Sequence, residues 1–178
     1  MGILKLNIPT VLTLSRIILI PVFVIVAYQH PFWGAAVFGI AALTDFLDGY
    51  LARRSGQITK FGIILDPLAD KFLVIAALVV LVDMTRLSAW MAIVIIVREF
   101  LVTGLRVVAL SKDIIIPAEM GGKLKTTAQI TAILCLILGG SIFDIDLYDV
   151  GMIFIWAALV LSVISGLQYT ISFWKKMR

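Results

Sequence analysis

The 178-residue sequence is poor in cysteine, in histidine and in charge. Its single cysteine, Cys135, excludes an internal disulfide framework. Its single histidine, His30, falls in a predicted outer connection between helices, so no His-based triad is available at the aspartate site described below. The absence of cysteine or histidine near that site argues against a conventional zinc site. Only 15% of the residues are charged, where a soluble domain has about 25%. These shortages exclude an ordinary soluble domain.

Long apolar runs take the place of the missing polar residues. The sequence is 62% hydrophobic, with a mean hydropathy of +1.12, which is typical of an integral membrane protein. Its length allows one compact domain, so we predict a single membrane domain over residues 1–178. The first apolar stretch is interrupted by Arg16 and is followed by no small-residue cleavage site. We therefore expect this stretch to remain as a membrane helix.

Six apolar segments are long enough, or nearly so, to cross about 30 Å of hydrocarbon as helices that rise about 1.5 Å per residue. We expect these helices at residues 9–28, 32–53, 67–82, 87–110, 123–139 and 150–174. The third and fifth are short, so we expect extended ends or a locally thinned bilayer. Strands are not expected, because the apolar runs are continuous rather than alternating. The prediction is an all-α, polytopic membrane protein with six transmembrane helices.

Lysine and arginine are distributed unequally between the two sides of these helices. The connections near residue 30 and at residues 140–149 hold neither, and the connection near residue 85 holds only Arg86. The opposite side receives Lys5, Arg53, Arg54, Lys60, Lys71, Arg106, Lys112, Lys123, Lys125, Lys175, Lys176 and Arg178. This asymmetry predicts that both termini are cytoplasmic. A net charge of +4 could suggest a nucleic-acid partner, but in a membrane protein the location of the charges matters more, and no nucleic-acid partner is expected.

Four aspartates, Asp45, Asp48, Asp66 and Asp70, lie near predicted helix ends on the cytoplasmic side. Asp45 and Asp48 share one helix face. Asp66 precedes Pro67, a favoured first helical residue, so we expect Asp66 at the helix cap and Asp70 one turn inside. A charged aspartate in a membrane helix costs about 2.5–3.5 kcal/mol, and clustered carboxylates repel one another. Two divalent cations would cancel their charge, and an all-oxygen ligand set suits Mg²⁺ or Mn²⁺.

Other interpretations of the same residues stay open. Asp66 alone could serve only as a helix cap, and Asp45 could form a structural pair with Arg16 or Arg98. A buried carboxylate can also relay protons, which makes a transporter the alternative from a different class of protein. A transporter is expected to distribute polar residues along several helices, whereas these carboxylates gather on one side of the membrane.

The pattern from Asp45 to Asp70 is Asp-x-x-Asp-Gly-x-x-Ala-Arg, eight residues, then Gly-x-x-x-Asp-x-x-x-Asp. It resembles, without a departure, the signature of the CDP-alcohol phosphotransferase family. The resemblance implies a metal-dependent membrane enzyme in which an alcohol attacks a CDP-lipid and expels CMP. It implies that the four aspartates bind the metal, with Asp70 also the general base. It implies a cytidine nucleotide pocket lined by Gly49, Ala52, Arg53 and Gly62.

A second group of polar residues could select the alcohol. The candidates for binding an anionic acceptor are Arg16, Arg98, Arg106, Lys123 and Lys125. Arginine can grip a phosphate with two parallel hydrogen bonds. Alternatively, the lysines and Arg106 are anchors that reach the lipid headgroups, and Arg98 forms a structural pair with Glu99 or an aspartate. Lys123 and Lys125 can face one site only if the chain near Gly121 and Gly122 is not yet helical.

An anionic acceptor favours glycerol 3-phosphate over choline, ethanolamine or glycerol. The sequences around Asn7–Thr10, Arg98-Glu99 and Gly122–Thr126 are similar to the phosphatidylglycerophosphate synthases within that family. This resemblance implies CDP-diacylglycerol and glycerol 3-phosphate as substrates, membrane lipids and a second copy of the chain as partners, and a multi-pass location in a bacterial inner membrane with the active site facing the cytoplasm. Family members that make phosphatidylserine, phosphatidylinositol phosphate or cardiolipin stay open as alternatives.

Overall fold

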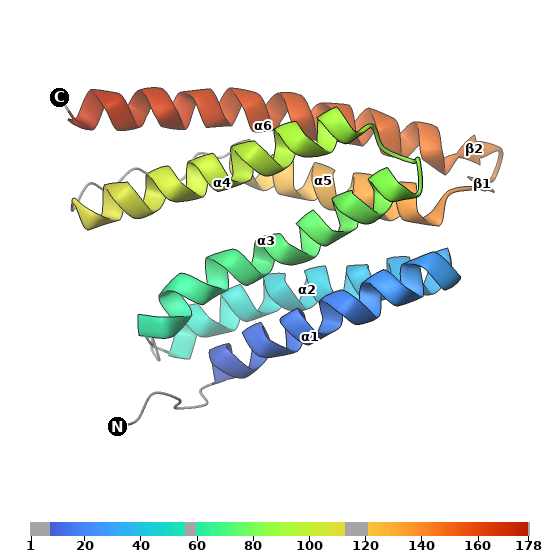
Figure 1. Ribbon diagram of the computed structural model, residues 1–178, viewed down its shortest axis with the longest axis horizontal. Coiled ribbons are helices and arrows are strands. Elements are labelled where there is room, and N and C mark those ends of the chain that lie inside the picture. Colours follow the sequence, from blue (N-terminus) through green and yellow to red (C-terminus); the bar gives the residue numbers. More distant parts are fainter. Residues whose placement is uncertain (1–7, 56–59, 113–120, 178) are drawn as a thin grey trace. The chain divides into compact units, whose positions relative to one another are not determined.

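The structure is a computed structural model that describes the backbone of residues 8–55, 60–112 and 121–177 and the side chains of residues 18–44, 71–109, 112 and 124–176. Its elements, in chain order (Figure 1), are α1 (Ile8–Gln29), α2 (Pro31–Ser55), α3 (Lys60–Asp83), α4 (Ala89–Ser111), α5 (Gly121–Leu138), β1 (Ser141–Ile142), β2 (Ile145–Asp146) and α6 (Leu147–Met177). The chain divides into two compact units, residues 1–80 and 81–178, and the boundary falls within α3.

The prediction of an all-helical architecture is confirmed: each of the six apolar segments forms a helix. The predicted ends lie within three residues of the observed ones, except at the start of α3. The continuous apolar runs explain this agreement. Within a helix the backbone groups form their hydrogen bonds inside the same segment, which an apolar surrounding requires.

The start of α3 corrects one prediction. The helix begins at Lys60, so Asp66 lies inside it and not at its cap. Proline is tolerated at a first helical position because its missing N–H has no partner there. Here the apolar run that precedes Pro67 extends the helix upstream, at the expense of the hydrogen bond that Ile63 would accept. The extension gives α3 24 residues, or about 36 Å, which supplies the length that the predicted third segment lacked.

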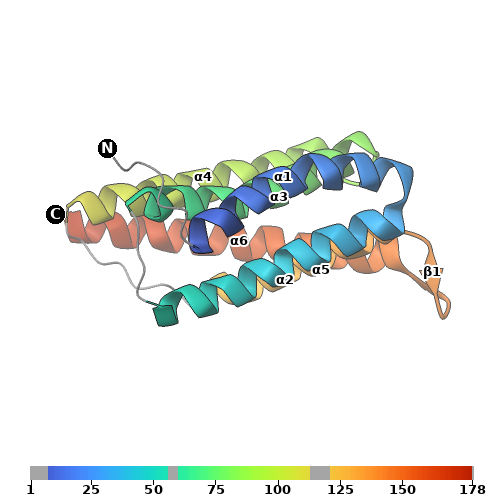
Figure 2. The same ribbon diagram turned by 90° about the horizontal axis from the view of Figure 1, so that it is seen from below.

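A short ribbon of two strands corrects a second prediction, which expected no strands. In the connection between α5 and α6, Ser141 pairs with Asp146 and Ile142 with Ile145 in antiparallel register. The two turn residues, Phe143 and Asp144, have φ angles of 51° and 63°. This is the conformation of a type I′ turn, whose twist matches that of a two-stranded ribbon. Figure 2 shows the hairpin at the end of the helical unit that contains α6.

In the first unit, α1 and α2 form an antiparallel pair on either side of His30. The rings of Phe23 and Phe38 are both fully buried, and their centroids lie 5.8 Å apart. Closer to the connection, a Cβ atom at Gly34 would lie 2.5 Å from the Cα atom of Ala27. Glycine is therefore required at residue 34, because any side chain there would force the two helix backbones apart.

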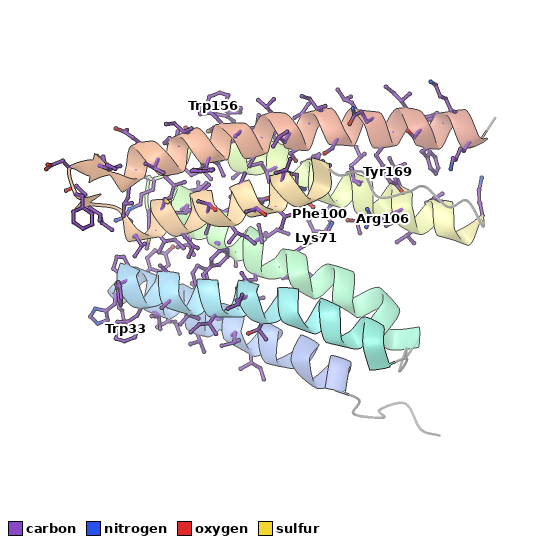
Figure 3. All side chains as sticks on the ribbon, turned by 180° about the vertical axis from the view of Figure 1, so that it is seen from behind. Trp33, Lys71, Phe100, Arg106, Trp156 and Tyr169 are labelled. Carbon is purple, nitrogen blue, oxygen red and sulfur yellow. The ribbon has the colours of Figure 1, made fainter. Side chains whose placement is uncertain are left out.

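In the second unit, α4 and α6 run in the same direction, and α5 runs against both. Two contacts, one near each end, establish the parallel pairing of α4 with α6. The rings of Trp90 and Trp156 lie 5.6 Å apart, and the guanidinium carbon of Arg106 lies 5.9 Å from the ring centre of Tyr169 (Figure 3). The connection through the hairpin brings α5 antiparallel to α6, and apolar side chains from all three helices are buried between them.

Arg86 lies in the connection between α3 and α4 and caps the end of α5. Its Nη1 atom donates to the carbonyl oxygens of Leu136 at 2.9 Å and Ile137 at 2.6 Å. The last carbonyls of a helix have no hydrogen-bond donor within the helix and carry partial negative charge. A guanidinium supplies both the donor and a positive charge. The same guanidinium fills the space beside Gly139, where a Cβ atom would lie 3.1 Å from Nη1. Arg86 was the one basic residue in the connections on the side of the helices that carries few positive charges. Its contacts with α5 show that it has a structural role.

An exposed apolar stripe runs along α6. It consists of Ile153, Trp156, Val160, Ile164, Leu167, Ile171 and Trp174, each at least 47% exposed. The spacing of three and four residues places them on one face over 21 residue steps, or about 32 Å. Among the described residues, one helix is long and apolar enough to cross a membrane, Leu147–Lys176, and three further apolar helical stretches are shorter. The dimensions of the stripe match the hydrocarbon core of a bilayer.

Candidate functional site

The four aspartates of the sequence pattern lie on two consecutive helices. Asp45 and Asp48 lie in the last three turns of α2, and Asp66 and Asp70 lie in the first half of α3. The helical backbone places Asp45 and Asp48 three positions apart and Asp66 and Asp70 four positions apart, so each pair shares a helix face. The side chains of all four lie outside the described residues. Four intervening residues join the two helix ends, so Ser55 and Lys60 are at most about 18 Å apart.

These helix positions fit a site for divalent metal by the chemistry of their donors. Each helix contributes two carboxylates from one face, and oxygen ligands are those that Mg²⁺ and Mn²⁺ prefer. In the part of the chain whose side chains are described, no three histidine, cysteine, aspartate or glutamate side chains come together. The assignment of the four aspartates to a metal site stays a prediction.

The positions predicted for the nucleotide pocket lie on the same two helices. Gly49, Ala52 and Arg53 follow the first aspartates on α2, and Gly62 precedes Asp66 on α3. Gly49 and Ala52 are small residues in a helix that continues to Ser55, so a ligand can approach the backbone closely there. Their surroundings lie outside the described residues, and the pocket stays a prediction.

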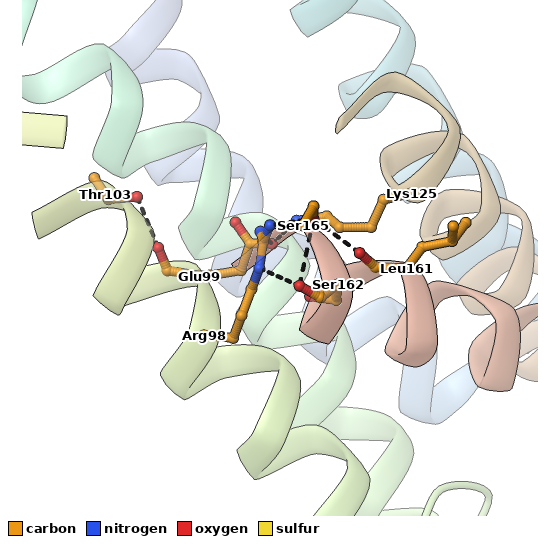
Figure 4. A network of polar contacts seen from close by, with 7 residues as sticks. All are labelled: Arg98, Glu99, Thr103, Lys125, Leu161, Ser162 and Ser165. Atoms are coloured by element: carbon orange, nitrogen blue, oxygen red, sulfur yellow. Dashed lines mark hydrogen bonds and ion pairs between the residues drawn. The ribbon is translucent and has the colours of Figure 1, made fainter. Parts of the chain in front are cut away.

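A network of polar contacts joins α4, α5 and α6 in the second unit (Figure 4). At its centre, Arg98 donates from Nε to the carbonyl oxygen of Ser162 at 2.7 Å and from Nη2 to Oγ of Ser165 at 2.5 Å. Its Nη1 atom donates to Oε1 of Glu99 at 3.2 Å. The predicted alternative, that Arg98 pairs with the neighbouring Glu99, is thus confirmed.

Lys125 of α5 completes the network by binding the same carboxylate oxygen. Its Nζ atom donates to Oε1 of Glu99, so one oxygen receives both cations. The side chains of Lys125, Arg98 and Glu99 are 7%, 15% and 16% exposed. Two cationic side chains thus meet at one carboxylate oxygen in a nearly buried place. Clustered N–H donors of cationic side chains are groups that bind anions such as phosphate.

Ser162, Ser165 and Gly166 are parts of the network that the sequence analysis did not identify. Gly166 makes room for the arginine: a Cβ atom there would lie 3.1 Å from both Cγ and Nε of Arg98. Their common feature in the sequence is that all three are small residues within one turn of an apolar helix, with Tyr169 one turn further on. That spacing indicates a helix face that accepts a bulky side chain, but it does not indicate which one.

Two buried polar atoms near this network lack a hydrogen-bond partner within the described part of the chain. They are Nε2 of Gln129, one turn after Lys125 on α5, and Oγ of Ser162 on α6. The two residues are 5% and 1% exposed. A buried polar atom without a partner is costly, so these two can still stabilise a bound polar group.

Of the three remaining predicted acceptor residues, the structure describes the side chain of Arg106 alone. Arg106 is exposed at the tyrosine of α6, as Figure 3 shows. The side chains of Arg16 and Lys123 lie outside the described residues. Because α5 is helical from Gly121, positions 123 and 125 lie about 200° apart around it, and the condition under which both could face one site is not met.

Comparison with known proteins gives a consistent result. The family model described as CDP-alcohol phosphatidyltransferase matches residues 6–164, which spans both compact units. A Bacillus subtilis protein named CDP-diacylglycerol–glycerol-3-phosphate 3-phosphatidyltransferase is 41% identical over 97% of this chain and 97% of its own length. Proteins of the same name are 41% identical in Haemophilus influenzae, over 93% and 92% of the two chains, and 38% identical in Rickettsia bellii, over 92% and 93%.

Proposed function

The chain belongs to the CDP-alcohol phosphatidyltransferase family, and from this premise we propose that it transfers the phosphatidyl group of CDP-diacylglycerol to glycerol 3-phosphate. A hydroxyl oxygen of the acceptor forms a bond to the lipid-side phosphorus, and the bond from that phosphorus to CMP breaks. The products are phosphatidylglycerophosphate and CMP. Relatives of this name that match nearly the full length of the chain support the assignment.

One observation of the structure supports the choice of acceptor: the cationic groups of Arg98 and Lys125 are held together on one carboxylate oxygen in a nearly buried place. A phosphate group on the acceptor supplies the negative charge and the oxygen acceptors that such a place binds. Choline or ethanolamine would add a positive charge beside these two cations, and glycerol carries no negative charge for them to bind. Arg106, Arg16 and Lys123 remain proposed contributors to acceptor binding.

For the chemical step, Asp45, Asp48, Asp66 and Asp70 would hold Mg²⁺ or Mn²⁺, with two ions matching their charge. Bound metal would stabilise negative charge on the phosphoryl oxygens. Asp70 is proposed to accept the proton of the attacking hydroxyl, since the chain's one histidine lies between α1 and α2 and carboxylates are the bases present on α2 and α3. Gly49, Ala52, Arg53 and Gly62 are proposed to bind the cytidine nucleotide.

The membrane arrangement belongs to the same proposal. Six helices cross the bilayer of a bacterial inner membrane, with both termini and the four aspartates on the cytoplasmic side. The positive charges at one set of helix ends and the exposed apolar stripe of α6 support this arrangement. A single domain over residues 1–178 and assembly into a homodimer remain predictions.

A panel of acceptors tests the reaction. Purified protein in detergent, given CDP-diacylglycerol and Mg²⁺, should release CMP with glycerol 3-phosphate and much less with serine, inositol phosphate or phosphatidylglycerol. A chelator of divalent metal should abolish the release. CMP release with another acceptor alone would replace the proposed substrate within the same family. No release with any acceptor would instead favour the transporter alternative.

A further inference from the structure

We propose that Gln129 and Ser162 bind the middle hydroxyl of the acceptor's glycerol, and that they thereby select an acceptor with a hydroxyl next to its phosphate-bearing carbon. The inference rests on the proposed function for the identity of the acceptor. It starts from two buried atoms that lack a partner among the described residues, Nε2 of Gln129 and Oγ of Ser162. The two residues are 5% and 1% exposed, so a hydrogen-bond partner for them has to be a bound group.

The register of α5 on α6 places the two residues in one helix interface. A Cβ atom at Gly151 would lie 2.7 Å from Cγ of Leu136, so these two positions are in direct contact. Gln129 lies seven residues before Leu136 on α5, and Ser162 lies eleven residues after Gly151 on α6. Both intervals are within about 20° of a whole number of turns, so both residues lie on the faces that meet at this contact. Because the helices are antiparallel, the two residues are only about 6 Å apart along the common axis.

The side chains of this pair lean toward one another. The Cα–Cβ bonds of a helix tilt toward its N-terminus, and the N-termini of α5 and α6 are at opposite ends of the interface. Gln129 therefore leans toward the level of Ser162, and Ser162 leans toward the level of Gln129. At the level of Gln129, the residue on α6 is Ala158, whose small side chain leaves room for the amide. The amide and the hydroxyl thus converge on one place.

This place is adjacent to the cations that are proposed to bind the acceptor phosphate. The carbonyl oxygen of Ser162 accepts from Nε of Arg98 at 2.7 Å, and Lys125 precedes Gln129 by one helical turn, or about 5.4 Å. Figure 4 shows Ser162 and Lys125 in the same network. A phosphate bound by the cations would bring the carbon chain of glycerol 3-phosphate to the pair.

The middle hydroxyl has the chemistry that the pair requires. A hydroxyl both donates and accepts, so it can accept from Nε2 of Gln129 and donate to Oγ of Ser162. The hydroxyl at the far end of the three-carbon chain is needed for the attack on the lipid-side phosphorus. The middle hydroxyl takes no part in that step, so fixed contacts with it do not hinder the reaction.

The site costs stability while it is empty, which gives a signature that a structural serine lacks. Ser162→Ala removes an unpartnered buried hydroxyl but keeps the carbonyl oxygen that binds Arg98. The melting temperature of the free protein in detergent should therefore rise by about 2–4 °C. The additional stabilisation by saturating glycerol 3-phosphate should become smaller than in the parent. A lowered melting temperature of the free variant would overturn the inference, because the hydroxyl would then have a structural partner.

Thr170→Val is the matched control on the same helix. It removes a hydroxyl that already donates to the carbonyl oxygen of Gly166 at 2.9 Å. The melting temperature of this variant should not rise, and its KM for glycerol 3-phosphate should equal that of the parent. A rise as large as that of Ser162→Ala would overturn the inference, since relief of an unpartnered hydroxyl would not be its cause.

Gln129→Leu tests the choice of hydroxyl with two acceptors, glycerol 3-phosphate and 3-hydroxypropyl phosphate, which lacks the middle hydroxyl. In the parent, the KM should be about tenfold lower for glycerol 3-phosphate than for the analogue. In Gln129→Leu, the two KM values should agree within about twofold, because the donor that distinguishes them is gone. The KM for CDP-diacylglycerol should not change. Equal KM values in the parent, or an undiminished preference in the variant, would overturn the inference.

Failure of this inference is distinguishable from failure of the proposed function, because a shift in melting temperature on ligand binding needs no turnover. A protein that binds glycerol 3-phosphate more tightly than 3-hydroxypropyl phosphate but releases no CMP would uphold the inference and refute the proposed reaction. CMP release without a preference between the two acceptors would uphold the reaction and refute the inference.

Discussion

At the scale of single residues, the sequence was most informative where spacing alone limits the chemistry. Four aspartates separated by three, eighteen and four positions within an apolar chain predict a metal site, because four clustered carboxylates are costly there unless cations offset their charge. The partners of Arg98 could not be predicted in the same way. Ser162 and Ser165 lie more than 60 residues away, and only the packing of α4 on α6 brings them to the guanidinium. The pairing of Arg98 with Glu99 could be predicted as one alternative, because the two residues are adjacent in the sequence.

The role of Asp70 is tested by Asp70→Asn. The amide cannot accept a proton, so turnover should fall by roughly 100-fold or more while CDP-diacylglycerol still binds. The measurements are CMP release in detergent and binding of the CDP-lipid to the same preparation. Asp144→Asn, outside the aspartate pattern, serves as the matched control and should retain full turnover. Near-normal turnover of Asp70→Asn would refute its assignment as the base.

At the scale of helices and connections, apolar runs predicted where helices exist but not where they start. The proline at residue 67 indicated a helix start, whereas the apolar residues before it continue α3 back to Lys60. The connection between α5 and α6 was predicted without strands. Its ribbon depends on two residues with positive φ that are not glycine, which a sequence pattern rarely reveals. Arg86 was identified only as an exception in the charge distribution, and its cap on α5 needed the structure.

Removing this cap should destabilise the second unit. Arg86→Ala leaves the carbonyl oxygens of Leu136 and Ile137 without their donor, so the free energy of unfolding should fall by about 1–3 kcal/mol. The measurement is thermal unfolding in detergent, followed by tryptophan fluorescence. Ile137 lies twelve residues, or about 18 Å, along α5 from Lys125, so the KM for glycerol 3-phosphate should not change. Unaltered stability, or a changed KM, would contradict this role.

At the scale of the whole molecule, the sequence predicted the helical class and the family; the structure confirms the first and the comparisons confirm the second. The asymmetry of lysine and arginine further predicts which helix ends face the cytoplasm. The division into two compact units, residues 1–80 and 81–178, could not be predicted from the sequence, since the boundary falls in the apolar second half of one continuous helix.

Labelling of single cysteines tests the orientation. In a Cys135→Ala background, Ser141→Cys in the hairpin should react with a membrane-impermeant maleimide added to intact spheroplasts. Lys112→Cys, after the end of α4, should react only once the membrane is permeabilised. Both residues are exposed in the structure, so a difference in reactivity reports the side of the membrane. Equal labelling of both without permeabilisation would contradict the assignment of cytoplasmic termini.

The parallel pairing of α4 with α6 has a consequence for biogenesis. The acceptor that Arg98 needs on Ser162 is 64 residues further along the chain. At about 5–20 residues per second, the ribosome takes roughly 3–13 s to produce it. During that interval the guanidinium of α4 has no partner on α6. The adjacent Glu99 is available from the start, and it can act as a temporary counterion until the later helix arrives.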